Sequence, residues 1–237
     1  MNSMRKADRV KIIVATHNEG KLVEIKRILF EECADFACQV TLLTAGSLGL
    51  PDPVETGVTF EQNALLKARC VASLTGCPAI ADDSGLIVDV LGAAPGILSA
   101  RWSGVHGDDL ANNTLLLKQL SDIPDPCRTA RFRCAVALAV PEDCNQIHQE
   151  SAMNHSHSFE IVRFGEMTGR LLRESRGENG FGYDPLFVPD DQPVRNGVQM
   201  EGLTSAELSS EEKNAISHRG KALRALLPEL KAMCFTE

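Results

Sequence analysis

Hydrophobic positions in the first third of the chain change between the period of a strand and that of a helix. A β-branched run at 10–15 predicts a strand, and 21–31 then places apolar residues at the three-to-four-residue spacing of a helix. The pattern weakens over 42–50. Apolar positions at 59–74 again share one helical face, and the short run 79–81 predicts another strand.

Longer candidate strands follow in the later part of the chain. Alternation is imperfect over 86–91, and the segment 109–120 has a leucine-rich helical face. The segment 131–140 has the β-branched and apolar content of a strand, and we expect 159–166 to pair with it. Strands that alternate with helices predict an α/β architecture.

The C-terminal region carries helix signals. Ser209-Ser-Glu-Glu212 fits a capping box, which starts a helix. The last amphipathic segment, 222–230, contains Pro228. Because proline removes a helical hydrogen bond, we expect it to bend or end this helix.

A polar insert at 145–158 separates the two long strands and contains His148, His155 and His157. A His-x-His pair on a strand can chelate a metal ion. No carboxylate or cysteine pattern completes such a site, so we interpret the insert as a solvated hairpin tip.

The composition of the chain limits the kinds of binding partner that we expect. The 237-residue chain is 43% hydrophobic and 24% charged, as in ordinary globular proteins, and its formal charge of −8 argues against binding of a nucleic acid polymer. Since no run approaches a membrane span and no apolar signal core is visible, we expect a cytoplasmic protein without a membrane partner. The eight cysteines form no Cys-x-x-Cys pair, which indicates reduced thiols.

The most distinctive polar feature is Asp82-Asp83, which is followed by Ser84 at the predicted end of a strand. Burying carboxylates is costly unless a cation or donors compensate, and Mg²⁺ is a hard cation that selects oxygen ligands. Neighbouring side chains of an extended backbone point to opposite faces. We therefore assign the metal and the water to Asp83 and a supporting role to Asp82. A simple turn is the alternative.

Two further segments offer groups that suit a phosphate. Residues 16–21 lie between the first strand and the first helix, where backbone N–H groups and the helix dipole favour an anion, although the spacing is not that of a P-loop. Lys21 in the first helical turn makes sense beside a polyanion. Glu55 and Lys67 add one more carboxylate and one more cation, but each alone is also typical of a solvated surface.

The segment 176–185 brackets Phe181 with glycines and carries Tyr183, the only tyrosine of the chain. An aromatic ring on a permissive backbone suits stacking of a flat base, which contributes roughly 1–3 kcal/mol. The alternative is a glycine-rich turn whose rings fill the core. His218 and Arg219 are donors that can address carbonyl or phosphate oxygens, or else lie on a solvated helix face.

Ordered motifs over residues 12–227 together resemble the inosine triphosphate pyrophosphatase family. The motifs are Ala15-Thr-His-Asn-Glu-Gly-Lys21, Glu55-Thr-Gly-Val-Thr-Phe60, Ala81-Asp-Asp-Ser-Gly-Leu86, Gly180-Phe-Gly-Tyr-Asp-Pro185 and Lys213-Asn-Ala-Ile-Ser-His-Arg219. The resemblance implies hydrolysis of the non-standard purine nucleoside triphosphates ITP, dITP and XTP to a monophosphate and pyrophosphate.

The same resemblance implies Mg²⁺ as cofactor and assigns roles to residues. Asp83 would be the base and a metal ligand, and Glu55 the other metal ligand. The implied substrate-binding positions are Thr16, His17, Asn18, Glu19, Gly20, Lys21, Lys67, Ser84, Phe181, Gly182, Tyr183, Asp184, Lys213, His218 and Arg219. Of these, His218 and Arg219 would read the 6-oxo group of the base.

For the fold, the resemblance implies an elongated α/β domain over 10–237, with a long mixed sheet flanked by helices and two lobes around a central cleft. It also implies a homodimer, and we expect residues 1–9 to form a flexible extension. The chain departs from the family pattern at His17, in the insert and in the extension 190–202. A pyrophosphatase for other modified nucleotides and a non-catalytic nucleotide sensor remain the alternatives.

Overall fold

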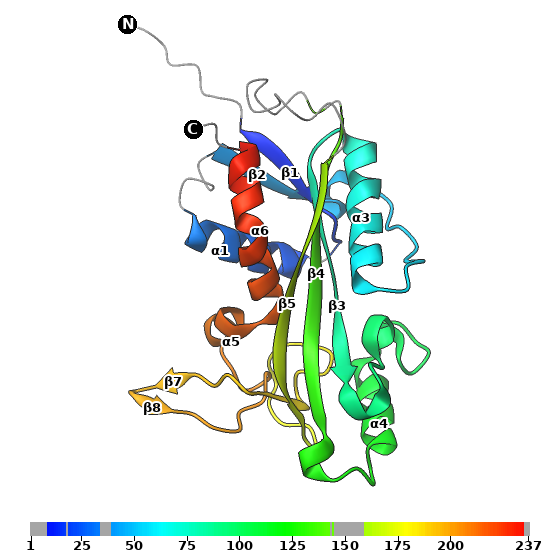
Figure 1. Cartoon of the computed structure of the whole chain (residues 1–237), viewed down its shortest axis with the longest axis vertical. Helices are drawn as coiled ribbons and strands as arrows, with labels where there is room; N and C mark the ends of the chain where they lie inside the picture. The colour runs from blue at the N-terminus through cyan, green and yellow to red at the C-terminus, as the bar shows by residue number, and fades with distance from the viewer. Residues whose placement is uncertain (1–8, 18, 34–38, 143, 145–158, 235–237) are drawn as a thin grey trace, which may run out of the picture. The chain divides into compact units, whose positions relative to one another are not determined.

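The computed structural model describes residues 9–17, 19–33, 39–142, 144 and 159–234. Its main sheet has six strands in the order β2-β1-β3-β4-β5-β6 (Figure 1). The predicted α/β class with a mixed sheet is confirmed. The histidine-bearing insert at 145–158 lies outside the described residues, as do positions 1–8 of the predicted extension.

Parallel and antiparallel pairs occur in the same sheet. β1 (Val10–Val14) runs parallel to β2 (Val40–Thr44) and to β3 (Ala79–Val88). By contrast, β5 (Phe159–Leu171) runs antiparallel to the short β6 (Phe187–Pro189). The stretch 42–50, which has only a weak pattern in the sequence, begins inside β2.

The chain forms two compact units. The first comprises the described residues of 1–82, 135–163 and 222–237, and the second comprises 83–134 and 164–221. The boundary falls within β3, between Asp82 and Asp83.

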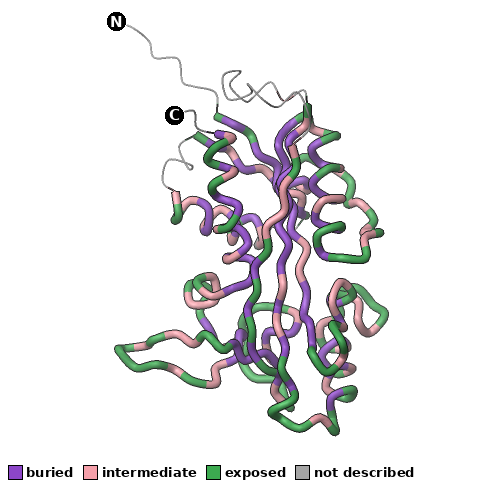
Figure 2. The backbone as a smooth tube through the Cα atoms, viewed as in Figure 1, coloured by how far each residue is buried: buried purple, intermediate pink, exposed green. Residues whose placement is uncertain are grey.

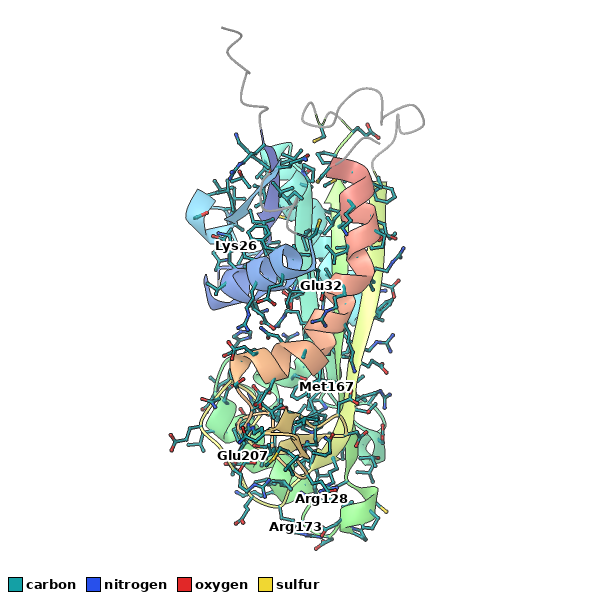
Figure 3. The ribbon with its side chains drawn as sticks, turned by 90° about the vertical axis from the view of Figure 1, so that its left-hand side faces the viewer. Lys26, Glu32, Arg128, Met167, Arg173 and Glu207 are labelled. Carbon is teal, nitrogen blue, oxygen red and sulfur yellow. The ribbon has the colours of Figure 1, made fainter. Side chains whose placement is uncertain are left out.

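Helices cover both faces of the sheet in the first unit. α1 (Glu19–Glu32) and the C-terminal part of α6 (His218–Cys234) lie on one face, and α3 (Phe60–Thr75) lies on the other (Figures 1 and 3). Thr59 caps α3, since its side chain accepts a hydrogen bond from the backbone N–H of Gln62. Both early helices thus begin near the predicted positions.

β3 corrects the prediction that a strand ends at Ala81. It continues through Asp82-Asp83-Ser84 to Val88. The reason is the apolar content beyond the polar residues: Leu86 and Val88 are fully buried. Burial of apolar residues on both sides of these three polar residues keeps the backbone extended, so the turn alternative for this segment is wrong.

α6 corrects the expectation that Pro228 could end the last helix, because the helix runs through it. Proline in a helix interior costs about 3 kcal/mol or more. Three leucines around it are buried, Leu226, Leu227 and Leu230, and each contributes roughly 1.5–3 kcal/mol. Packing of the apolar face therefore outweighs the lost hydrogen bond.

The second unit has its own apolar core, in which β3, β4 (Thr129–Val140) and β5 are packed against α4 (Asp109–Gln119) (Figure 2). Leu116 of α4 is fully buried in this core. The predicted helix 109–120 is confirmed. Side chains from both aromatic and aliphatic residues meet in this core: Leu86, Val88, Leu116, Leu120, Ala130, Phe132, Met167, Leu171, Tyr183, Leu186 and Phe187.

One buried arginine, Arg128, fixes the connection between α4 and β4 (Figure 3). Arg128 is 1% exposed and donates to the backbone carbonyls of Leu120, Leu171 and Leu172. Burial, and then the charge of Arg173, lower the pKa of Arg128. Hydrogen bonds to three carbonyls offset the cost of burying this cation.

A hairpin and a short helix complete the second unit. β7 (Val194–Arg195) and β8 (Val198–Gln199) are joined by an Asn-Gly turn with positive φ at both residues, as type I′ hairpins require. α5 (Ser210–Ile216) starts with the predicted capping box. No described helix combines the length and the hydropathy that a membrane span needs.

Truncation on α4 tests this account of the core. We expect Leu116→Ala to lower the free energy of unfolding by about 2–5 kcal/mol, because it removes fully buried side-chain volume. Leu110→Ala is the matched control, since Leu110 lies on the same helix but is 79% exposed; its cost should stay within about 0.5 kcal/mol. Urea denaturation gives both values, and equal losses would contradict the assignment of the buried face.

Candidate functional site

The first unit pairs a buried carboxylate with the lysine of the first helix. Lys21 lies in the first turn of α1, and its Nζ is 3.5 Å from Oδ2 of Asp82, whose side chain is 4% exposed. The ammonium group offsets the cost of burying this carboxylate. The sequence predicts that Lys21 contacts a phosphate, which stays a prediction; in the structure its ammonium group pairs with the Asp82 carboxylate.

A second lysine–carboxylate pair comes from α3 and the loop before it. Lys67 is 8% exposed, and its Nζ donates to Oε1 of Glu55 at 2.8 Å. Asn63 accepts a hydrogen bond from the backbone N–H of Gly57 at 2.8 Å. A Cβ on Gly57 would lie 2.5 Å from Asn63 Oδ1, so only glycine lets the loop approach the helix this closely.

The segment between β1 and α1 is held against the loop that follows the second strand. Thr16 is buried, and its carbonyl accepts from the backbone N–H of Gly46 at 3.2 Å. His17 Nε2 lies 2.8 Å from the carbonyl oxygen of Leu50, which can only accept, so Nε2 carries the proton. Asn18 lies outside the described residues, and the surroundings of Glu19 and Gly20 are not described.

Asp83 and Ser84 open the second unit, and both are half-buried. Their neighbour Asp82 is only 5% exposed. The two carboxylates thus differ in burial, although β3 does not alternate strictly, since Ser84 is half-buried like Asp83. The more accessible carboxylate is therefore the one that we predicted to hold metal and water.

The donor chemistry of these carboxylates fits Mg²⁺. Among the described residues, no group of three or more His, Cys, Asp or Glu side chains is gathered as a metal cage. Mg²⁺ commonly binds through one or two carboxylates, with waters and substrate phosphates as its other ligands. Glu55 and Asp83 are carboxylates of that kind, and each lies in a different unit.

The second unit presents an aromatic ring on a loop that one carboxylate holds. Phe181 is 60% exposed, and Nζ of Lys213 lies 5.2 Å from the centroid of its ring. Asp184 is buried; its Oδ2 accepts from the Phe181 backbone N–H at 2.9 Å and lies 2.5 Å from Nζ of Lys213. The backbone of Phe181 and the ammonium group of Lys213 are thus held by the same carboxylate.

The two rings of this loop have different roles. Tyr183 is 3% exposed, belongs to the apolar core and donates its hydroxyl to the carbonyl oxygen of Ser99 at 2.9 Å. Burial, and then the charge of Asp109, raise the pKa of Tyr183. Tyr183 therefore fills the core, as the alternative interpretation predicted, whereas Phe181 is the exposed ring, and stacking of a base on it stays a prediction.

His218 and Arg219, the first two residues of α6, are 8% and 4% exposed. The His218 ring stacks on Phe132, with centroids 5.0 Å apart and an interplanar angle of 14°. Hence the alternative of a solvated helix face is wrong for both residues. Donor groups that are this buried suit a small, shaped ligand better than a polymer.

Sequence reasoning missed the residues that support these groups. Arg195 of the hairpin forms a two-pronged ion pair with Glu212, at 2.8 and 2.7 Å, next to Lys213. Its hydrogen bond, with that from the Ser209 backbone, lowers the pKa of Glu212 to about 2. The extension 190–202 therefore braces the start of α5. Pairing across such distances along the chain leaves no local signal.

α4 also contributes two polar groups, to which the sequence analysis assigned no role. Asp109 and Asn113 both contact the backbone of Gly182, the first through its carboxylate and the second through its amide. Their spacing of four residues places them on one side of the helix. That spacing was visible in the sequence, but the loop that they meet was not.

The fold and these groups define an α/β protein suited to a phosphorylated ligand with a flat ring. The chain belongs to the Ham1 family, whose family model matches residues 12–229. This match confirms the family resemblance of the motifs.

Individual relatives agree with the family assignment. The chain is 59% identical to a dITP/XTP pyrophosphatase of Bifidobacterium longum subsp. infantis, over 94% of this chain and 99% of that protein. A nucleoside-triphosphatase / dITP/XTP pyrophosphatase structure from Mycobacterium abscessus matches with a TM-score of 0.67 and 47% identity, over 92% and 100% of the two chains. A HAM1 protein from Coxiella burnetii matches with a TM-score of 0.73 and 36% identity, over 94% and 98%.

Two glycines of the Phe181 loop make a matched test of its geometry. Gly180 and Gly182 both have positive φ, but only on Gly180 would a Cβ overlap the Asp184 carboxylate. We expect Gly182→Ala to cost about 1–2 kcal/mol of unfolding free energy from backbone strain alone. Gly180→Ala should cost clearly more, because it also displaces Asp184 from Lys213. Chemical denaturation measures both, and a smaller loss for Gly180→Ala would refute this geometry.

Proposed function

We propose that this protein hydrolyses the non-standard purine nucleoside triphosphates ITP, dITP and XTP to the monophosphate and pyrophosphate, and so clears them from the nucleotide pool. The observation that carries the proposal is the 59% identity, over nearly the whole of both chains, to a protein named dITP/XTP pyrophosphatase. Action in the cytoplasm, as a homodimer and with Mg²⁺, is part of the proposal.

Asp83 is the proposed general base. Its half-buried carboxylate accepts a proton from the water that attacks the triphosphate. The bond from the water oxygen to phosphorus forms while the bridging bond between the α- and β-phosphates breaks, and pyrophosphate leaves. Asp82, which is neutralised by Lys21, supports the position of its neighbour on β3.

Charge compensation comes from two lysines and a metal ion. Mg²⁺, held by Glu55 and Asp83, would neutralise charge that develops on the phosphate oxygens. Lys21 and Lys67 are the cations that bind the triphosphate. In the structure each of them contacts a carboxylate, which keeps the ammonium groups in place before the substrate arrives.

The base is recognised by stacking and by donors. Phe181 offers its exposed ring, and His218 and Arg219 donate to the 6-oxo group of hypoxanthine or xanthine. Adenine presents an amino donor at that position, and the resulting mismatch costs on the order of 1–3 kcal/mol. Guanine shares the 6-oxo group, so its exclusion depends on contacts other than these donors.

A substrate panel tests the specificity. With Mg²⁺ present, we expect pyrophosphate release from ITP, dITP and XTP to exceed release from ATP about 5- to 150-fold in kcat/KM, which corresponds to the cost of one mismatched polar contact. Modified pyrimidine triphosphates belong in the panel, since fast release from them would favour the alternative pyrophosphatase. Equal rates on ITP, ATP and GTP would refute the specificity.

Replacement of the base tests the catalytic assignment. Asp83→Asn should lower kcat at least about 10²-fold, because the amide cannot accept the proton, while the circular dichroism spectrum stays unchanged. Asp122→Asn is the control, an exposed aspartate of the same unit, and should retain full activity. Full activity of Asp83→Asn would rule out this base, whereas binding of ITP by the wild type without any pyrophosphate release would favour the sensor.

A further inference from the structure

The loop that carries Phe181 is fixed to α4 at a single glycine. Asp109 Oδ2 accepts a hydrogen bond from the backbone N–H of Gly182 at 2.7 Å, and Asn113 Nδ2 donates to the Gly182 carbonyl oxygen at 2.9 Å. The two peptide groups on either side of this residue are therefore both held by one helix. Asn113 is 8% exposed, so its hydrogen bond to Gly182 is largely shielded from water.

We call these two hydrogen bonds the α4 clamp. Gly182 is the position where they restrict the backbone most effectively. Its φ is +62°, in the left-handed region that glycine enters at little cost and also leaves at little cost. Without contacts from other segments, a glycine with this conformation would let the orientation of the preceding residue, Phe181, vary. Hydrogen bonds on both sides of the residue restrict φ and ψ together, and Phe181 is the residue directly before it.

Two more contacts show that the rest of the loop is anchored independently. The Phe181 backbone N–H donates to Asp184, and the Tyr183 hydroxyl donates to the Ser99 carbonyl. The Asp184 backbone N–H also donates to the Phe181 carbonyl oxygen, at 3.3 Å, and this long hydrogen bond closes a turn around Gly182 and Tyr183. The contacts from α4 add two shorter hydrogen bonds, at 2.7 and 2.9 Å, to the peptide groups on either side of Gly182, and so they restrict the backbone next to the exposed ring of Phe181.

We propose that Asp109 and Asn113 are positioning residues for the nucleoside, which hold the Phe181 ring in its stacking orientation before the substrate binds. The inference rests on the proposed function, because it assumes that a purine stacks on Phe181. A ring that is ordered in advance saves the entropy of ordering it on binding. The clamp therefore acts on nucleotide affinity, through Phe181, and leaves the chemistry at Asp83 unchanged.

The chain offers a close control for this inference. Asp108 is the N-cap of α4, and its Oδ1 accepts from the backbone N–H of Ala111 at 2.9 Å. Asp108→Ala weakens the same helix but leaves the contacts to Gly182 in place. Asp109→Ala removes one of these contacts, Asn113→Ala removes the other, and Asp109→Asn keeps an acceptor oxygen.

The kinetic experiment compares these variants with ITP as substrate. Asp109→Ala and Asn113→Ala should each raise KM about ten-fold, equivalent to about 1.4 kcal/mol, with kcat within about two-fold of the wild type. Asp109→Asn should restore most of the affinity, and Asp108→Ala should leave KM unchanged. Equal KM values for Asp108→Ala and Asp109→Ala, or a loss confined to kcat, would overturn the inference.

Hydrogen exchange at the Phe181 amide gives a readout that does not depend on activity. This amide donates to Asp184 and not to α4, so faster exchange in Asp109→Ala, but not in Asp108→Ala, reports a loosened loop rather than the deleted contact. Unchanged exchange would refute the clamp. If the wild type released no pyrophosphate from ITP, the proposed function would fail, and this exchange comparison would still decide whether α4 positions the loop.

Discussion

Burial of the Asp82 carboxylate on β3 is the constraint on which the candidate site depends. β3 carries Asp82 between apolar residues that are fully buried, and a carboxylate in such a place requires a positive partner. Lys21 supplies that charge from the first turn of α1. The position of α1 against the sheet, and the presence of a lysine where a helix dipole disfavours one, follow from the same need.

The second unit is organised around a carboxylate in a similar way. Asp184 is buried and contacts both Lys213 and the backbone of Phe181. Around it, Gly180 leaves the space that the carboxylate occupies. In each unit, therefore, a desolvated carboxylate holds a lysine near a position where the ligand is expected. Such groups are ordered before binding, which lowers the entropic cost of recognition.

Supporting contacts extend this order outward from the ligand-binding groups. Arg195 braces Glu212 beside Lys213, and α4 clamps Gly182 beside Phe181. Both contacts join segments that lie far apart in the sequence. They connect the extension 190–202 and the leucine-rich helix α4 to residues for which we propose a role in binding, although neither segment carries a family motif.

The sequence by itself determined the α/β class, most of the helices and the family, because hydrophobic periodicity and contiguous motifs are local properties. It also identified Asp82, Asp83, Lys21 and Phe181 as residues that needed an explanation. It misjudged the end of β3, since burial of apolar residues farther along the chain outweighed the local preference of aspartate for turns; of its two expectations for Pro228, only the end of the helix is excluded.

Only the tertiary structure decided which polar groups are paired and which rings are exposed. Phe181 and Tyr183 stand two residues apart on the same glycine-rich loop, yet one ring is exposed and the other fills the core. The contacts of Lys67 with Glu55 and of Asp109 with Gly182 likewise depend on how helices and loops pack. Hydrogen bonds and ion pairs act through space at short range, so their partners appear only when the chain has folded.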